Sequence, residues 1–180
     1  MKTWITSDLH FGHANIQKFC PVTRGRFKDI KDMREQMIAE WNAQVGADDE
    51  TFILGDFAFL PAKDAITILR RLNGTKILIE GNHDRKLLND SAFRAEFRQV
   101  HQYLRYNHNG QLVIMMHYPV YDHDQAARGS IMLHGHRHGN PHNIPGRIMD
   151  VGFDATGQVV SSLDSIVENM QTVQHMYHHG

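Results

Sequence analysis

The chain has 180 residues, a formal net charge of −1 at pH 7 and one cysteine, Cys20. This length fits a single domain over residues 1–180, and the lone cysteine excludes an internal disulfide. The near-neutral charge argues against a protein that wraps extended nucleic acid. No signal peptide and no membrane-spanning run is recognisable, so we expect a cytoplasmic protein without a membrane partner.

In the first half, short apolar runs alternate with segments of helical periodicity. Apolar residues recur at helical spacing in 29–45, and Pro61 and Gly74 frame a second helical segment. Strand–helix–strand order of this kind predicts parallel pairing. The expected strands are 3–7, 51–55 and 76–81, and the expected helices are 29–45, 61–74 and 84–98.

The second half reads mainly as strands. Residues 102–107 and 111–117 flank His-Asn-Gly, a hairpin turn signal, and two more strands are expected at 130–135 and 147–153. A serine N-cap opens a last helix over 161–176. We expect hairpins to dominate this half, and a mixed α/β sandwich or layered fold for the whole chain.

Polar side chains follow five of the predicted strands. In open α/β sheets, ligands bind in the crevice beyond the carboxyl ends of the strands. A single Asp or His at such a place is typical of a turn or surface residue, but five coincident cases favour a metal site. The residues are Asp8 and His10, then Asp56, then Asn82, His83 and Asp84, then His117, and finally His136 and His138.

The donor types narrow the choice of metal. Carboxylate, imidazole and amide groups without thiolate suit Mn, Fe, Zn, Co or Ni rather than a cysteine-rich structural zinc. Two ions bridged by Asp56 would account for the excess of donors over one coordination sphere, and the pair would keep a charge of about +2 for a phosphate and a hydroxide. The seven candidate ligands are Asp8, His10, Asp56, Asn82, His117, His136 and His138.

The ordered motifs resemble those of the calcineurin-like metallophosphoesterase superfamily, in its small bacterial and phage branch. They are DxH at 8–10, GD at 55–56, GNHD at 81–84, a lone His117 and GHxH at 135–138. The resemblance covers nearly the whole chain. It implies an α/β fold in which two mixed β-sheets pack as a sandwich flanked by helices, in four layers.

The resemblance also implies roles for the residues. A hydroxide bridging two divalent ions would attack phosphorus, His83 would protonate the leaving oxygen or stabilise the transition state, and Asp84 would orient the His83 ring. Manganese is the first expectation for both ions, with Fe, Zn, Co or Ni as alternatives. The first ion would take Asp8, His10, Asp56 and His138, and the second Asp56, Asn82, His117 and His136.

The expected activity is hydrolysis of phosphodiester bonds in small or cyclic nucleotides or 2′,3′-cyclic phosphate ends. A phosphomonoesterase or a nuclease using the same site is the alternative. A non-catalytic scaffold is disfavoured because the ligand set is complete. Phe59 stands where protein phosphatases carry an acid, which argues against that branch. The partner is a small phosphoester, including a nucleotide or RNA end, and the oligomeric state stays open.

Other residues near the motifs are weighed against ordinary roles. We expect His136 and His138 to bind different metals, whereas His134 ends a strand. Asp150 and Asp154 are expected to stabilise turns, and Asn140 and His142 are candidates for the rim. Candidates for substrate binding, each with a turn, surface or packing role as the alternative, are His13, Arg24, Arg26, Tyr118 and Arg137.

Overall fold

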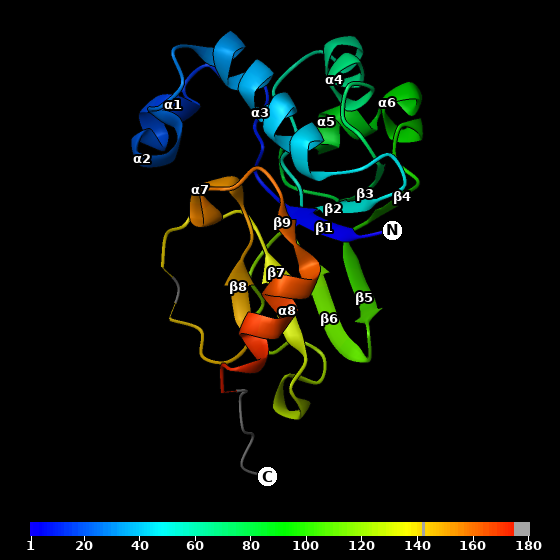
Figure 1. The fold of residues 1–180 in the computed structure, drawn as a ribbon, viewed down its shortest axis with the longest axis vertical. Helices are drawn as coiled ribbons and strands as arrows, with labels where there is room; N and C mark the ends of the chain where they lie inside the picture. The colour runs from blue at the N-terminus through cyan, green and yellow to red at the C-terminus, as the bar shows by residue number, and fades with distance from the viewer. Residues whose placement is uncertain (142, 175–180) are drawn as a thin grey trace.

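The computed structural model describes residues 1–141 and 143–174 (Figure 1). Its first sheet has the strand order β4-β3-β2-β1-β9. Strands β1, β2 and β3 pair in parallel, as predicted; two strands that the sequence did not predict extend the sheet, β4 parallel to β3 and β9 antiparallel to β1. The strands of this sheet are β1 Thr3–Thr6, β2 Glu50–Ile53, β3 Thr75–Ile79, β4 Gln99–His101 and β9 Ser161–Ser162.

The second sheet has the order β5-β6-β7-β8. Strands β5 (Tyr103–His108) and β6 (Gln111–Met116) form the predicted hairpin. Strands β7 (Ile131–His134) and β8 (Ile148–Asp150) join in parallel, so the expectation that hairpins dominate this half was wrong. The connections between these strands are long enough for the crossovers that parallel pairing requires.

The long predicted helices are present, with revised ends. Asp29 caps α3 by accepting a hydrogen bond from the Asp32 amide, and Ser162 caps α8. The predicted helix 84–98 is divided because the Asp90 side chain caps a new helix. Residues 175 and 176 of the expected last helix lie outside the described residues. The helices are α1 Ile16–Phe19, α2 Pro21–Arg24, α3 Ile30–Gln44, α4 Ala62–Leu69, α5 Arg85–Leu88, α6 Ser91–Ala95, α7 Phe153–Thr156 and α8 Leu163–Gln171, with a short 3₁₀ turn at Ala126–Arg128.

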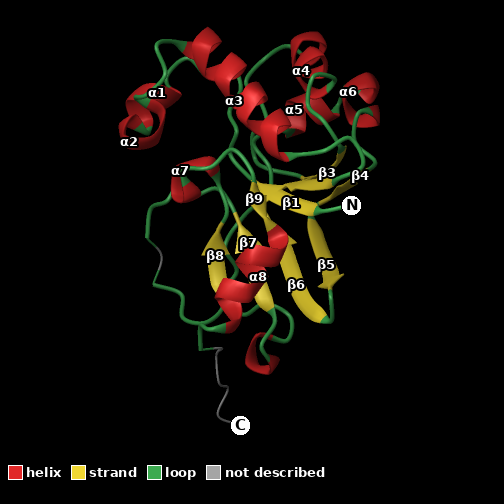
Figure 2. Cartoon of the chain, in the orientation of Figure 1, coloured by secondary structure: helices red, strands yellow, loops and turns green. Residues whose placement is uncertain are grey.

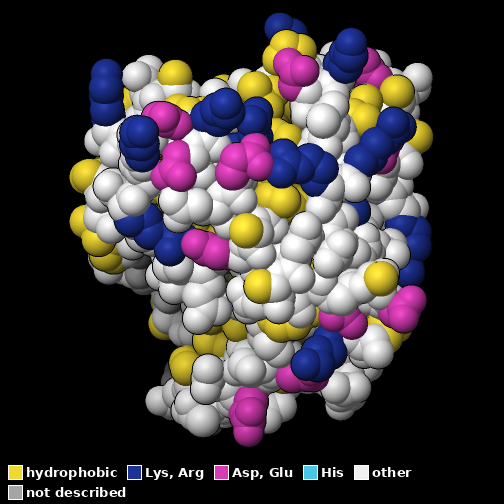
Figure 3. Space-filling model, turned by 45° about the horizontal axis from the view of Figure 1, so that its top comes forward, with side chains coloured by type: hydrophobic (Ala, Val, Ile, Leu, Met, Phe, Trp, Pro, Cys, Tyr) yellow, Lys and Arg dark blue, Asp and Glu magenta, His cyan; other side chains and the backbone are white. Residues whose placement is uncertain are grey.

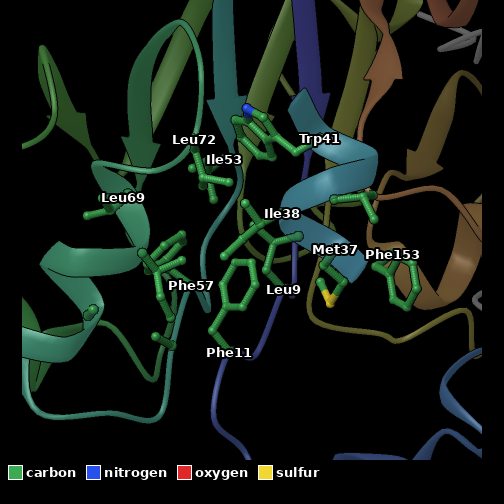
Figure 4. Packing of buried hydrophobic residues seen from close by; sticks show 14 of the residues in the cluster. Leu9, Phe11, Met37, Ile38, Trp41, Ile53, Phe57, Leu69, Leu72 and Phe153 are labelled. Atoms are coloured by element: carbon green, nitrogen blue, oxygen red, sulfur yellow. The ribbon is translucent and has the colours of Figure 1, made fainter. Parts of the chain in front are cut away.

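Helices α3 to α6 cover the outer face of the first sheet (Figure 2). Trp41 and Met37 of α3 lie in this interface with Phe11, Phe57 and Phe153 (Figure 4). Burial of such large apolar side chains is the main stabilising contribution of this layer.

A second cluster fills the space between the sheets. Ile5 and Phe52 of the first sheet belong to it together with Val113 and Leu133 of the second. Apolar side chains of α8 join the same cluster, while a smaller cluster around Met132 covers the outer face of the second sheet. The prediction of two mixed sheets packed as a sandwich with flanking helices is confirmed.

Candidate metal centre

The carboxyl ends of β1, β2, β3, β6 and β7 bring the predicted ligands together in two groups. In the first group, His10 Nε2 lies 3.7 Å from Asp8 Oδ1 and 3.7 Å from Asp56 Oδ2. His138 Nε2 completes it, 3.7 Å from the same Asp8 oxygen. We call Asp8, His10, Asp56 and His138 the first donor group.

The second donor group consists of Asp56, Asn82, His117 and His136. His117 Nε2 lies 3.6 Å from Asp56 Oδ2 and 2.9 Å from Asn82 Oδ1. His136 Nδ1 lies 3.0 Å from the same amide oxygen. A single oxygen, Asp56 Oδ2, therefore faces both groups.

Several of these donor atoms are buried without a hydrogen-bond partner. Among the described residues, Asp8 Oδ1 and both ring nitrogens of His10 have none. A buried polar atom without a hydrogen-bond partner lowers the stability of the fold. Separations of 3.6–3.7 Å are too long for hydrogen bonds but short enough for two donors to share an ion. The residues present therefore fit divalent metal ions.

The backbone of the ligand loops is strained. Asp8, His10 and Asp56 have φ of 56°, 50° and 56°, and His136 and His138 have φ of 69° and 49°. A left-handed conformation of a residue other than glycine costs about 1–3 kcal/mol and persists only where the surroundings impose it. Hydrogen bonds between the loops, such as Asp8 N to the Gly55 carbonyl and His10 N to the Asp56 carbonyl, do so here.

Two glycines permit the close approach of these loops. Gly55 has φ +93°, and a Cβ on it would lie 2.5 Å from His117 Nδ1. A Cβ on Gly135 would lie 2.3 Å from Asp8 Oδ2. Neither position has room for a side chain, so glycine at both is a condition for assembling the centre.

Hydrogen bonds orient two of the imidazole rings. His117 Nδ1 donates to the Leu54 carbonyl at 2.7 Å, which leaves Nε2 facing Asp56 and Asn82. His138 Nδ1 donates to Asp154 Oδ2 at 2.8 Å, which leaves Nε2 facing Asp8. A histidine that binds a metal through one nitrogen is typically held in this way through the other.

Asp154 thus has a larger role than the turn stabilisation expected for it. Its carboxylate also accepts hydrogen bonds from Thr23 and from the Arg24 guanidinium. Burial opposes charge at His138, but the bond to Asp154 raises the pKa of the His138 ring above its usual value. The signal in the sequence is an acid shortly after strand β8, the pattern that marked the other candidates.

Burial and neighbouring charge set the ionisation of the other donors. Burial favours a neutral Asp8 carboxyl, but the polar His10 ring next to it and the charges of His117 and His138 lower its pKa below the usual value. Burial also lowers the pKa of His10 and of His136. Ionised carboxylates and neutral imidazoles are the forms that bind metal.

The prediction that Arg24 binds substrate is wrong. Its side chain is fully buried, and its guanidinium donates to both oxygens of Asp154 and to the carbonyls of Asp8 and Leu9. A further contact with Met33 Sδ occupies the remaining donor. Arg24 therefore stabilises the loop that carries Asp8 and Leu9. No N–H of its guanidinium is left to bind a phosphate.

The other two predicted arginines also have partners away from the donor groups. Arg26 pairs with Glu40 at 2.8 Å and stacks on Phe27. Arg137 donates to the Pro141 carbonyl at 3.0 Å. The pairing of Arg26 with Glu40 disfavours a role in phosphate binding, and substrate binding by Arg26 and by Arg137, on the loop between two ligands, stays a proposal.

The structure separates His83 from Asp84. The His83 side chain is 45% exposed, and its Nε2 lies 3.9 Å from Asp56 Oδ2. Asp84 is fully buried, and its oxygens accept hydrogen bonds from the backbone amides of Asp56, Phe57 and Gly81. The expectation that Asp84 orients the His83 ring is corrected, since its bonds position the ligand loops instead.

Aromatic contacts surround the remaining candidates. His13 stacks on Phe59 with ring centroids 4.2 Å apart, and Phe59 also lies 4.5 Å from the His83 ring. Tyr118 lies edge-on to His136 at 4.7 Å, beside the second donor group. His13, Phe59 and Tyr118 therefore border the centre. No signal in the sequence indicated that Phe59 would contact three histidines, namely His10, His13 and His83.

Two further expectations concern the end of β7 and the loop after it. His134 is buried, bonds the Gly135 carbonyl through Nδ1 and belongs to neither donor group. Asn140 lines a pocket beside the centre, as expected for a rim residue, whereas His142 lies outside the described residues. The three alternating histidines of this stretch thus differ in position.

The fold and these two donor groups define a metallophosphoesterase. The model of the family described as calcineurin-like phosphoesterase matches residues 1–148, and the chain belongs to this family. It is therefore a metal-dependent phosphoesterase, with candidate metal-binding clusters at Asp8, His10 and His138 and at Asp8, Asp56 and His117.

Relatives of the chain occur in archaea and phages. An uncharacterized protein of Methanocaldococcus jannaschii is 33% identical over 141 residues, covering 77% of this chain and 70% of that protein. The Gene 66 protein of Mycobacterium phage L5 is 32% identical over 191 residues, covering 88% and 89%. A solved structure of a protein of unknown function from Aquifex aeolicus is similar in fold, with a TM-score of 0.74, 22% identity and coverage of 93% and 98%.

The helices offer no membrane span. Within residues 1–141 and 143–174, none is long and apolar enough to cross a bilayer.

Proposed function

We propose that the chain hydrolyses phosphodiester bonds with two divalent ions, one in each donor group. The observation behind this proposal is the place of Asp56 Oδ2, 3.7 Å from His10 Nε2 and 3.6 Å from His117 Nε2. Two bound ions would polarise the phosphoryl oxygens and lower the pKa of water to near neutrality. Manganese is the first choice, because imidazole, carboxylate and amide donors suit it.

His83 is the proposed proton donor to the leaving oxygen. Its backbone amide donates to Asp56 Oδ1, which holds the residue beside the donor that both groups share. Its ring is nevertheless open to solvent, so it can face a substrate. General acids act from such positions within hydrogen-bond reach of the reacting atom.

The preference for diesters follows from the cations near the centre. Arg24 is fully engaged in internal hydrogen bonds, and Arg26 is paired with Glu40. Neither of these two guanidinium groups is therefore free to balance the second negative charge of a monoester. Lys and Arg are interspersed with Asp and Glu on the face in Figure 3, so that face has no continuous basic surface for extended nucleic acid.

Substrate profiling tests the proposal. Metal-free protein loaded with Mn²⁺ should hydrolyse bis(p-nitrophenyl) phosphate with a kcat/KM about tenfold or more above that for p-nitrophenyl phosphate, a difference of about 1.4 kcal/mol. Chelation or Asn82→Ala should remove the activity. A higher kcat/KM for the monoester would favour the phosphomonoesterase alternative. Stoichiometric metal without hydrolysis of either ester would favour a scaffold.

A further inference from the structure

A pocket of ≈ 580 Å³ lies beside the first donor group. His10, His83 and His138 line it on the side of the centre, so it is continuous with the proposed reaction site. Helices α1 and α2, which the sequence did not predict, line the opposite side.

The far side of this pocket is apolar and exposed. Phe19 of α1 is 68% exposed and Val22 of α2 is 95% exposed. Phe59, which lies against the histidines of the centre, is 37% exposed. Hydrophobic side chains gather at the left edge of Figure 3, the side on which α1 and α2 lie in Figure 1. Exposed apolar side chains that gather next to a site are characteristic of ligand binding.

The charge of the pocket contrasts with that of its neighbour. Among the described residues that line the ≈ 580 Å³ pocket there is no Lys or Arg, and Arg24 beneath it is buried. A second pocket of ≈ 990 Å³ is lined by Arg85 and Lys86. Phe59 and His83 line both pockets and form the boundary between them.

We propose that the ≈ 580 Å³ pocket binds an aromatic ester group carried by the phosphorus of the substrate. This inference rests on the proposed function, because the phosphate must lie at the donor groups. Phe59, stacked on His13 at an interplanar angle of 13°, supplies an aromatic surface, and Phe19 and Val22 supply the apolar edge. An aromatic ring gains from both contacts, whereas the described lining of the pocket offers no Lys or Arg to a charged group.

Two phosphonates with the same charged head test this inference by calorimetry on the full-length protein loaded with Mn²⁺. Phenylphosphonate should bind about tenfold more tightly than methylphosphonate, as expected for burial of the additional apolar surface. Phe19→Ser and Val22→Ser should each lower the affinity for phenylphosphonate severalfold and leave that for methylphosphonate unchanged. Tyr103→Ser is the matched control, because Tyr103 is 41% exposed on β5 and lines neither pocket.

The outcomes separate the two levels of the argument. Equal affinities of the wild-type protein for the two phosphonates would overturn the aromatic pocket and leave the proposed function intact. The same conclusion follows if Phe19→Ser and Val22→Ser both keep the wild-type preference for phenylphosphonate over methylphosphonate. If metal-loaded protein binds neither phosphonate, the proposed phosphate site fails, and the pocket inference fails with it.

Discussion

The two donor groups share Asp56 but differ in how the protein supports them. In the first, Asp8 and His10 are buried, and the His138 ring is held by Asp154, which Arg24 holds in turn. In the second, His117 is buried and bonded to Leu54, but Asn82 is half-buried.

The exposed member of the second group is His136. Its ring contacts Asn82 and Tyr118, and the structure shows no carboxylate hydrogen-bonded to its second nitrogen among the described residues. The two donor groups therefore contain similar ligand types, but the first is more buried and better supported by hydrogen bonds than the second. Since partners behind a ligand raise metal affinity about 10–100-fold, we expect the first group to hold its ion more firmly.

Removal of the shared donor should have the largest effect. Asp56→Ala should abolish binding at both groups and lower kcat/KM by about a thousandfold or more, about 4 kcal/mol of transition-state stabilisation. Metal content by mass spectrometry and turnover of a diester measure both effects. Asp64→Ala, which removes an exposed acid on α4, is the control. Retention of two ions by Asp56→Ala would contradict the shared role.

Single-ligand variants should distinguish the groups. His136→Ala and His138→Ala should each bind one ion fewer and lose activity about a hundredfold or more. Loss of a residue that supports a ligand typically costs about 10–100-fold in metal affinity or activity, and loss of the ligand itself should cost at least as much. The ion left in His136→Ala should resist a chelator, and the ion left in His138→Ala should not. His134→Ala should keep both ions, because His134 lies in neither group. Equal loss of metal from all three variants would refute this division.

Asp154→Asn tests the support of the first group. The affinity for the first ion should fall about 10–100-fold because the His138 ring loses its carboxylate. The free energy of unfolding should fall by about 3–5 kcal/mol, since Arg24 becomes a buried charge without its partner. Metal titration and urea denaturation measure the two effects. An Asp154→Asn protein with wild-type affinity and stability would show that the support is dispensable.

Arg26→Ala should have the smallest effect. Arg26 and Glu40 form a pair whose side chains are 45% and 34% exposed, and such pairs contribute about 0–1 kcal/mol. Diester hydrolysis should stay within about twofold of the wild type, well under 1 kcal/mol by the usual relation. A large rise in KM would restore Arg26 as a substrate-binding residue.

The sequence by itself determined which donor types follow the strands and that β1, β2 and β3 pair in parallel. Both depend on local patterns, namely apolar runs of strand length and the polar residues next to them. The second sheet shows the limit of such patterns. The His-Asn-Gly turn specifies the β5–β6 hairpin locally, but the parallel pairing of β6 with β7 depends on a long crossover that no short motif encodes.

Only the tertiary structure decided how the charged residues are used. Arg24 and Asp154 are separated by 130 residues yet form one buried pair behind His138. Asp84 stands beside His83 in the chain, but its oxygens point to the amides of the preceding ligand loop. These distant residues are brought together by the packing of the sheets. A buried charge is unfavourable unless it is paired, so each buried charged group lies next to a partner. Neither arrangement can be inferred from the neighbouring residues in the sequence.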